Sequence, residues 1–337
     1  MAVVKEFPYP AIAGDAASSH WKPEIGTTRA IKYAQGTAGT GKSAAFRSEM
    51  ETTMYAAIRR LGRALRGLAV ITLPALGTTV WAQSPPNLGA AIDDLVAANR
   101  ILYRQGVVDG FGHISIRHPE RKDRFLMSAS LAPGRVSKAD IMEFDLDGKP
   151  LDQRDRSIYS ERFIHSEIYK ARPDVNAVLH SHSPTVIPFS VSQVPLRPIL
   201  NSEGFLAPNV PVFEMRRVAG SGSLLVTDGM RGKALAETLG DRPVALMRGH
   251  GNVVVGPSVQ RVVARAIYTE VNARLLIQAI TLGGPLVYID AEEGKAGEGN
   301  RDRNEAGHAT DRIWQLWVEE AMGANMGANT GPAETKR

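Results

Sequence analysis

The stretch ARPDVNAVLHSH at residues 171–182 decides the fold and the chemistry expected of this chain. Pro173 stops the helix expected before it, and the run from Ala177 to His182 is predicted to be a β-strand. Side chains of a strand alternate between its two faces, so His180 and His182 lie on the same face. Two neighbouring imidazoles supply half of a metal site. An H-x-H pair alone also fits structural histidines, so a further ligand has to come from elsewhere.

His250 is the expected third ligand. It lies between Gly249 and Gly251, in a turn that follows the predicted strand Val244–Met247. Glycines on both sides let the backbone approach closely and direct the imidazole. Three neutral histidines suit zinc, and also manganese, cobalt or iron.

A helix expected over Ser160–Ala171 supplies a carboxylate. Glu161 and His165 are four residues apart and share one helix face. Two structural interpretations stand beside the functional one: Ser160 is a helix cap, and Glu161 complements the helix dipole.

The rest of the globular part alternates strands with helices and contains no Gly-x-Gly-x-x-Gly motif or internal repeat, which indicates a mixed α/β layer fold. Helices are expected over Ala90–Gly106, Ser258–Thr281 and Ala309–Met322, and strands over His113–His118, Phe125–Met127, Ile141–Leu146, Val212–Glu214, Leu224–Thr227 and Asn252–Val255.

These motifs together resemble the class II aldolase/adducin family, over roughly residues 90–285. The resemblance rests on residues 160–165, on 171–182 and on RGHG at 248–251. It implies a three-layer α/β/α fold with a central mixed, mainly antiparallel sheet. It also implies one divalent metal per subunit on His180, His182 and His250, with Glu161 as the acid/base that also reaches the metal. Family members form tetramers, so a homo-oligomer is expected.

Departures from the family pattern favour its decarboxylase branch. His113 in GHIS (112–115) replaces the family's Asn, and SASLAPG (128–134) and Tyr159-Ser160 replace hydroxyl-rich phosphate loops. Ser130 and Ser160 are the candidate substrate-binding hydroxyls. Arg197 is either a fork for a substrate carboxylate or a structural arginine.

The expected function is therefore a metal-dependent carbon–carbon lyase, which decarboxylates a hydroxylated aromatic or related carboxylate through a metal-stabilised enolate. Glu161 is the proton donor, His113 a second group that orients the substrate, and His165 a support behind them. The alternatives are an aldolase or epimerase acting on a sugar phosphate, and a non-catalytic adducin-like interaction domain.

The resemblance implies a small-molecule substrate as the partner, and the charge distribution along the chain argues against nucleic acid. Residues 1–82 hold ten Lys/Arg against five Asp/Glu, whereas residues 83–337 hold thirty of each, so no phosphate-tracking surface for nucleic acid is expected. The chain contains no cysteine, which excludes disulfides and thiolate chemistry.

The first eighty residues are not expected to belong to this domain. GTAGTGKS (36–43) matches a phosphate-loop pattern by chance, because no apolar strand precedes it. Residues 54–82 have the basic leader, apolar core and small-residue cleavage site of a signal peptide, and the apolar core is too short for a stable membrane span. The alternative is an amphipathic or core helix in an N-terminal extension. The expected organisation is an extension over 1–53, a signal peptide over 54–82, the domain over 83–289 and a polar tail with one helix over 290–337. Translation from Met54 predicts a periplasmic or secreted protein, and otherwise a cytoplasmic one.

Overall fold

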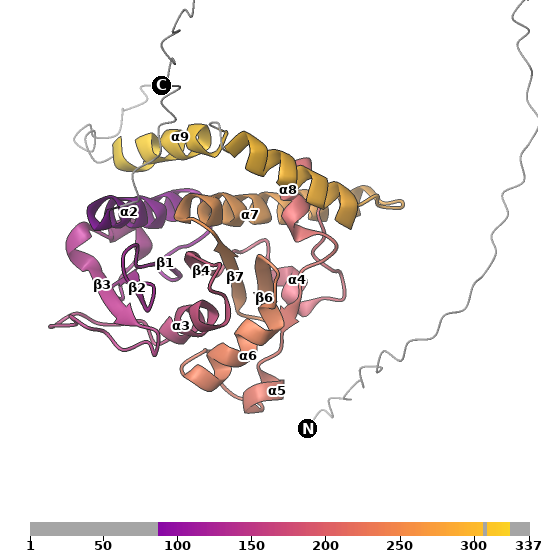
Figure 1. Cartoon of the computed structure of the whole chain (residues 1–337). Helices are drawn as coiled ribbons and strands as arrows, with labels where there is room; N and C mark the ends of the chain where they lie inside the picture. Colours follow the sequence, from indigo (N-terminus) through magenta and orange to yellow (C-terminus); the bar gives the residue numbers. More distant parts are fainter. Residues whose placement is uncertain (1–86, 306–308, 324–337) are drawn as a thin grey trace, which may run out of the picture. The chain divides into compact units, whose positions relative to one another are not determined.

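The computed structural model describes residues 87–305 and 309–323 (Figure 1). The predicted extension over 1–53, the signal peptide over 54–82 and the phosphate-loop match therefore lie outside the described residues. Within the described part, no helix is long and apolar enough to cross a membrane.

A seven-stranded sheet of order β3-β2-β1-β4-β7-β6-β5 forms the centre of the domain. Only β5 and β6 pair in parallel among the described strands, and every other pair is antiparallel. This confirms the predicted mixed, mainly antiparallel sheet. The strands are β1 His113–Arg117, β2 Arg124–Ser128, β3 Ile141–Asp145, β4 Ala177–Ser181, β5 Val212–Phe213, β6 Val244–Met247 and β7 Gly251–Gly256.

Helices cover both faces of the sheet and complete three layers (Figure 1). Helices α2 (Leu88–Arg104) and α7 (Val259–Leu282) pack on one face, and α3 (Arg162–Ala171) and α6 (Gly229–Leu239) pack on the other. The period-two alternation of β4 divides its residues between the two cores: Leu179 belongs to the core under α2 and α7, and Val178 to the core under α3 and α6. Each such buried side chain contributes roughly 1.5–3 kcal/mol.

Shorter and C-terminal helices complete the chain. They are α4 Ile187–Val191, α5 Arg216–Ala219, α8 Ala291–Glu305 and α9 Ala309–Gly323, with the 3₁₀ helix η3 at Asn201–Leu206. Side chains cap three of the longer helices: Asn87 at α2, Asp228 at α6 and Ser258 at α7. Each accepts a hydrogen bond from an otherwise unpaired N–H of the first turn.

The polar tail was predicted to hold one helix, which is wrong, because α8 precedes α9. Helix α8 has no apolar face, so hydrophobic periodicity in the sequence does not reveal it. Its contact with η3 is made by glycine instead. A Cβ on Gly204 would lie 2.8 Å from Gly294 Cα, and a Cβ on Gly294 would lie 2.5 Å from Gly204 O. Two backbones this close admit only hydrogen as a side chain.

The strand predicted over Leu224–Thr227 is also absent from the sheet. The segment has no regular secondary structure, and two of its backbone groups bond to side chains. Val226 N donates to Glu161 Oε1 at 2.8 Å, and Leu224 O is bonded by His250 Nδ1 at 3.2 Å. Apolar composition predicted a strand here, whereas tertiary contacts determine where these polar groups bond.

Candidate metal centre

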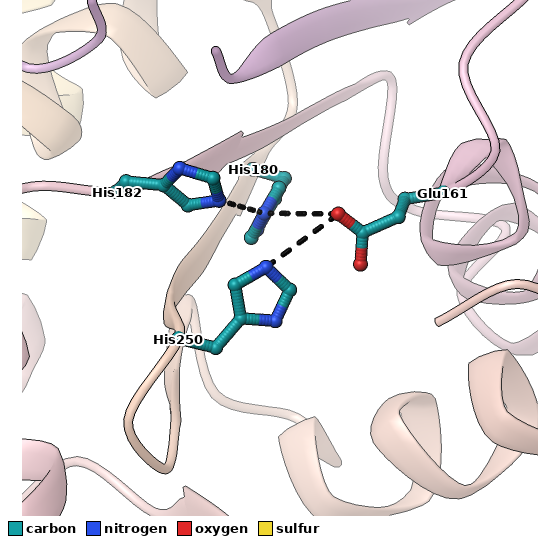
Figure 2. Close-up of side chains that lie close together, drawn as sticks. All are labelled: Glu161, His180, His182 and His250. Atoms are coloured by element: carbon teal, nitrogen blue, oxygen red, sulfur yellow. Dashed lines mark hydrogen bonds and ion pairs between the residues drawn. The ribbon is translucent and has the colours of Figure 1, made fainter. Parts of the chain in front are cut away.

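Four side chains from separate parts of the chain converge beside the sheet. Glu161, His180, His182 and His250 each offer one ligand atom, and these atoms all lie within 4.8 Å of one another (Figure 2). The three imidazoles have ring centroids 4.8–5.0 Å apart. The structure therefore brings together the three histidines and the glutamate that the sequence singled out.

The strands and one turn determine where the histidines lie. His180 is on β4, opposite His113 on β1 and Val253 on β7, and His182 follows one residue after the strand ends. His250 lies in the turn between β6 and β7.

Glycines permit that turn. Gly249 has φ +63°, in the left-handed region that other residues rarely adopt. A Cβ on Gly251 would lie 2.2 Å from Ser181 O. The turn therefore approaches β4 more closely than any side chain at position 251 would allow.

Backbone carbonyls orient two of the rings. His180 Nδ1 lies 3.2 Å from Asn252 O, and His250 Nδ1 lies 3.2 Å from Leu224 O. A carbonyl only accepts, so both Nδ1 atoms carry the hydrogen and both Nε2 atoms present a lone pair to the centre. Such carbonyl partners are common behind metal-binding histidines.

The donor set fits a divalent cation. His250 Nε2 is buried and makes no hydrogen bond to the described residues. His180 Nε2 and His182 Nε2 lie only 3.1 Å apart. Lone pairs that converge without enough hydrogens to satisfy them are stabilised by a cation, and three imidazoles with a carboxylate suit zinc or manganese.

Glu161 uses its two carboxylate oxygens differently. Oε1 accepts the hydrogen bond from Val226 N, and Oε2 lies 3.7 Å from His180 Nε2 and 3.5 Å from His250 Nε2. Burial raises the pKa of Glu161, but the nearby imidazoles of His250 and His180 and the Val226 N–H outweigh burial and lower the pKa to about 2. The carboxylate is thus ionised at neutral pH.

Neither structural alternative for this helix start accounts for the arrangement. Glu161 occupies the N-cap position of α3, and no side chain makes a capping hydrogen bond there. Ser160 is exposed and lines the cavity described below. The Glu161 carboxylate faces the histidines in Figure 2.

Burial favours the neutral form of His180 and His182, the form that binds a metal. Desolvation, offset in part by Glu161, lowers the pKa of His180 to about 3. Desolvation also lowers the pKa of His182. An imidazole without a proton on Nε2 is free to bind a metal without first losing one.

A cavity of about 630 Å³ opens beside the candidate metal centre, and Glu161, His180 and His182 line it. Aromatic and aliphatic side chains form much of its wall, and the polar groups are few: the site residues themselves with Ser130 and Ser160. Among the described residues, no lysine or arginine lines this cavity. The full lining is Gly110, Phe111, Gly112, His113, Ser130, Leu131, Ala132, Ile158, Tyr159, Ser160, Glu161, His180, His182 and Leu225.

His113 and His165 lie next to this group but do not belong to it. His113 Nδ1 is 2.6 Å from His165 Nε2, and His165 Nδ1 is 2.6 Å from Ser115 Oγ. His113 lines the cavity, whereas His165 is fully buried behind it. The structure thus places His165 behind His113 rather than against the predicted metal ligands.

Comparison with known proteins agrees with this geometry. The family model described as the class II aldolase and adducin N-terminal domain matches residues 93–277. The chain belongs to this family. Its predicted fold class is confirmed by the L-fuculose 1-phosphate aldolase from Glaciozyma antarctica PI12, with a TM-score of 0.59 at 25% identity, covering 77% of this chain and 98% of that one.

Two curated relatives of this chain are named as decarboxylases. The chain is 37% identical over 259 residues to the decarboxylase tropJ of Talaromyces stipitatus, covering 69% of this chain and 96% of the relative. It is 32% identical over 217 residues to the 3,4-dihydroxyphthalate decarboxylase of Arthrobacter keyseri, covering 60% of this chain and 84% of the relative.

Arg197 does not line the cavity of this class II aldolase domain. Its guanidinium lies 4.0 Å from the centroid of the Tyr288 ring, and its Nε donates to Pro208 O at 3.1 Å. Both contacts are structural. A role for Arg197 as a carboxylate anchor stays a prediction.

Residues that support the ligands were missed by sequence reasoning. Glu270 on α7 accepts hydrogen bonds from Ser183 Oγ and from Thr185 N, and so holds the segment after His182. Ser190 Oγ accepts from Gly249 N at 3.0 Å, which fixes the His250 turn. Only Glu270, a buried carboxylate on an otherwise apolar helix face, had a detectable signal in the sequence.

Proposed function

We propose that this chain is a divalent-metal-dependent decarboxylase of ring-hydroxylated aromatic carboxylates. The observation that carries the proposal is the group of three histidines and one ionised glutamate beside a cavity with aromatic walls. The expectation of an enzyme of the lyase type is confirmed by the family match and the decarboxylase relatives. The metal, its identity and the substrate are the proposed parts.

The metal ligands are Nε2 of His180, His182 and His250, and Oε2 of Glu161 lies beside them, 3.5 Å from His250 Nε2, where it is left to handle the proton. A divalent metal held there supplies a Lewis acid, which favours the negative charge that develops on a substrate oxygen during carbon–carbon cleavage. Zinc and manganese fit this donor set best, and cobalt and iron also accept it.

The cavity walls position a flat ring. Tyr159 and Phe111 offer aromatic faces, and Leu131, Ile158 and Leu225 fill the spaces between them. Ser130 and Ser160 offer hydroxyls to the substrate's oxygens. A mainly apolar pocket with a few placed polar groups is the usual design for such a ligand.

Glu161 handles the proton. Because its carboxylate is ionised, Oε2 accepts the proton of the substrate hydroxyl next to the carboxylate-bearing carbon. The bond to the carboxylate then breaks, carbon dioxide leaves, and the electron pair stays on the ring. Oε2 returns its proton to that carbon, so atoms and charge balance.

The test is carbon dioxide release by the full chain reconstituted with zinc or manganese. We expect release from 3,4-dihydroxyphthalate or from dihydroxybenzoates, and none from benzoate, which lacks the hydroxyl. His182→Ala and chelator treatment are each expected to abolish it. Release that is unaffected by both treatments would overturn the metal-dependent reaction.

A sugar-phosphate aldolase is the second candidate, since the solved neighbour named above is an L-fuculose 1-phosphate aldolase. The cavity argues against it, because a phosphate dianion would meet no cationic side chain among the lining residues. Cleavage of L-fuculose 1-phosphate in the same assay would reverse this preference. A non-catalytic adducin-like role is disfavoured because all four candidate ligands are present.

The sequence also suggests how the chain assembles and where it is located. We propose a homotetramer, which sizing with light scattering tests. We also propose that the chain translated from Met54 is exported and cleaved before Gln83, which N-terminal sequencing of the mature protein tests. Both rest on the sequence alone.

A further inference from the structure

A buried chain of hydrogen bonds leads from the cavity into the core between β1 and α3. It runs from His113 Nδ1 to His165 Nε2 at 2.6 Å, from His165 Nδ1 to Ser115 Oγ at 2.6 Å, and from Ser115 Oγ to Tyr169 OH at 2.9 Å. All four side chains are at most 3% exposed. Buried polar groups such as these need hydrogen-bond partners, and here the side chains supply them to one another.

The hydroxyl of Tyr169 sets the direction of the donors. Burial raises the pKa of Tyr169, whereas the Val178 backbone lowers it, as an N–H that donates to the phenol oxygen does. Ser115 Oγ is then the acceptor for the phenol hydrogen, and a buried phenol hydrogen without an acceptor costs about 1–3 kcal/mol. Tyr169 therefore donates to Ser115 Oγ. Ser115 then donates to His165 Nδ1, which leaves the hydrogen of the neutral His165 ring on Nε2.

His165 in turn determines the tautomer of His113. Burial lowers the pKa of His165 to about 3, so this ring carries one hydrogen at neutral pH. That hydrogen, on Nε2, is donated to His113 Nδ1. The neutral His113 ring therefore carries its own hydrogen on Nε2.

The His113 ring lines the cavity, and the contact of Nδ1 with His165 leaves Nε2 as the ring nitrogen available to the cavity. This Nε2 makes no hydrogen bond among the described residues. The ring is held between Tyr159 and His180, with centroids 4.5 and 5.2 Å away. A fixed N–H thus points toward the space where a substrate would bind.

We propose that Ser115, Tyr169 and His165 act as positioning residues that hold His113 as an Nε2–H donor for an anionic oxygen of the substrate. The inference rests on the proposed function only for its substrate class. In a cavity without lysine or arginine lining, one oriented N–H distinguishes a ring that carries an anionic substituent from one that does not. If all the hydrogen bonds of this series ran in the opposite direction, His113 Nε2 would present a lone pair and repel that oxygen.

The first test is the tautomer itself. Long-range proton–nitrogen correlation on the ¹⁵N-labelled, zinc-loaded full chain separates protonated from bare ring nitrogens, and His113→Gln identifies the His113 signals. We expect a protonated Nε2 and a bare Nδ1 in His113. A bare Nε2 overturns the proposal, whatever the enzyme's activity.

The second test is binding selectivity without turnover. The probes are catechol and 2,3-dihydroxybenzenesulfonate, whose sulfonate resembles a carboxylate but cannot leave as carbon dioxide. Calorimetry on the zinc-loaded wild type is expected to give about tenfold tighter binding of the sulfonate, the gain from one charge-assisted hydrogen bond.

Matched variants test whether the preference for the sulfonate over catechol comes from His113 and the residues that position it. His113→Leu is expected to abolish it, and His113→Gln, whose amide reaches the position of Nε2, to retain most of it. Ser115→Ala and Tyr169→Phe are expected to reduce it by about threefold, because His165 is then free to reverse. An unchanged preference in His113→Leu overturns the proposal. Loss of carbon dioxide release with this pattern intact would count against the proposed function alone.

Discussion

The two faces of the central sheet differ in character, although the same strands contribute side chains to both. On the face covered by α2 and α7, Ile114 and Leu179 lie in an apolar core and are not exposed. On the face covered by α3, the neighbours His113, Ser115 and His180 carry polar groups that are equally buried. Successive residues of β1 and β4 therefore alternate between the apolar core and the candidate site.

The difference shows what a buried polar face requires. Apolar residues need only volume and shape, whereas each buried imidazole needs a defined partner for both nitrogens. Among the described residues, Asn252 O orients His180, His165 orients His113, and His250 Nε2 makes no hydrogen bond. We infer that a metal completes this second face.

The largest expected effect separates the two faces by activity. His180→Ala removes a ligand and is expected to lower kcat/KM for carbon dioxide release at least about 100-fold, as loss of a charge-stabilising group does. Circular dichroism would verify that the variant is folded. Near wild-type turnover in a folded His180→Ala variant would contradict a role for the histidine site in catalysis.

The adjacent residue should give the opposite pattern. Leu179→Ala leaves a hole in the core under α2 and α7 and is expected to lower the free energy of unfolding by about 2–5 kcal/mol. Its metal content should be unchanged. Urea unfolding measures the first quantity and elemental analysis the second; lost metal with full stability would break the comparison.

A pH titration of the metal-free protein tests whether the buried imidazoles of the polar face are neutral. His165 and His180 have pKa values of about 3, below the ordinary 6.5, so the unfolded chain binds more protons than the folded chain below pH 6.5. Stability is therefore expected to be complete above pH 6.5 and to fall as pH drops toward 3.

The expected slope is about 1.4 kcal/mol per pH unit for each of these histidines. Urea unfolding between pH 6.5 and 5 measures it before Glu161, whose ordinary pKa is 4.5, contributes. A free energy of unfolding that is constant over this window would contradict the neutral, buried state of these rings.

The smallest effect is expected at Arg197. Its contacts are the Tyr288 ring and Pro208 O, so Arg197→Met is expected to cost at most about 1 kcal/mol of stability and to change kcat/KM less than about threefold. Steady-state kinetics decide. A KM raised tenfold or more would restore Arg197 as the carboxylate anchor suggested by the sequence.

The sequence predicts those parts of the site that regular structure or the family pattern determines. Strand alternation alone placed His180 and His182 on one face, and Gly249 and Gly251 indicated the turn that carries His250. Contacts made by backbone atoms leave no pattern in the side chains. Val226 N and Leu224 O, which hold Glu161 and His250, therefore looked like part of a strand.

Register explains the other omission. His113 lies opposite His180 because β1 pairs with β4, and it meets His165 from α3, 52 residues further along the chain. Spacing within one segment does not reveal such neighbours. The resemblance to the family suggested a role for each residue, but not their direct hydrogen bond.

Metal stoichiometry of three versions of the full chain tests the central claim most directly. Elemental mass spectrometry after loading with zinc or manganese is expected to find about one metal per chain in the wild type and in Leu179→Ala, and less than about a tenth of that in His180→Ala. Equal metal in all three, or none in the wild type, would contradict a metal centre on this face of the sheet.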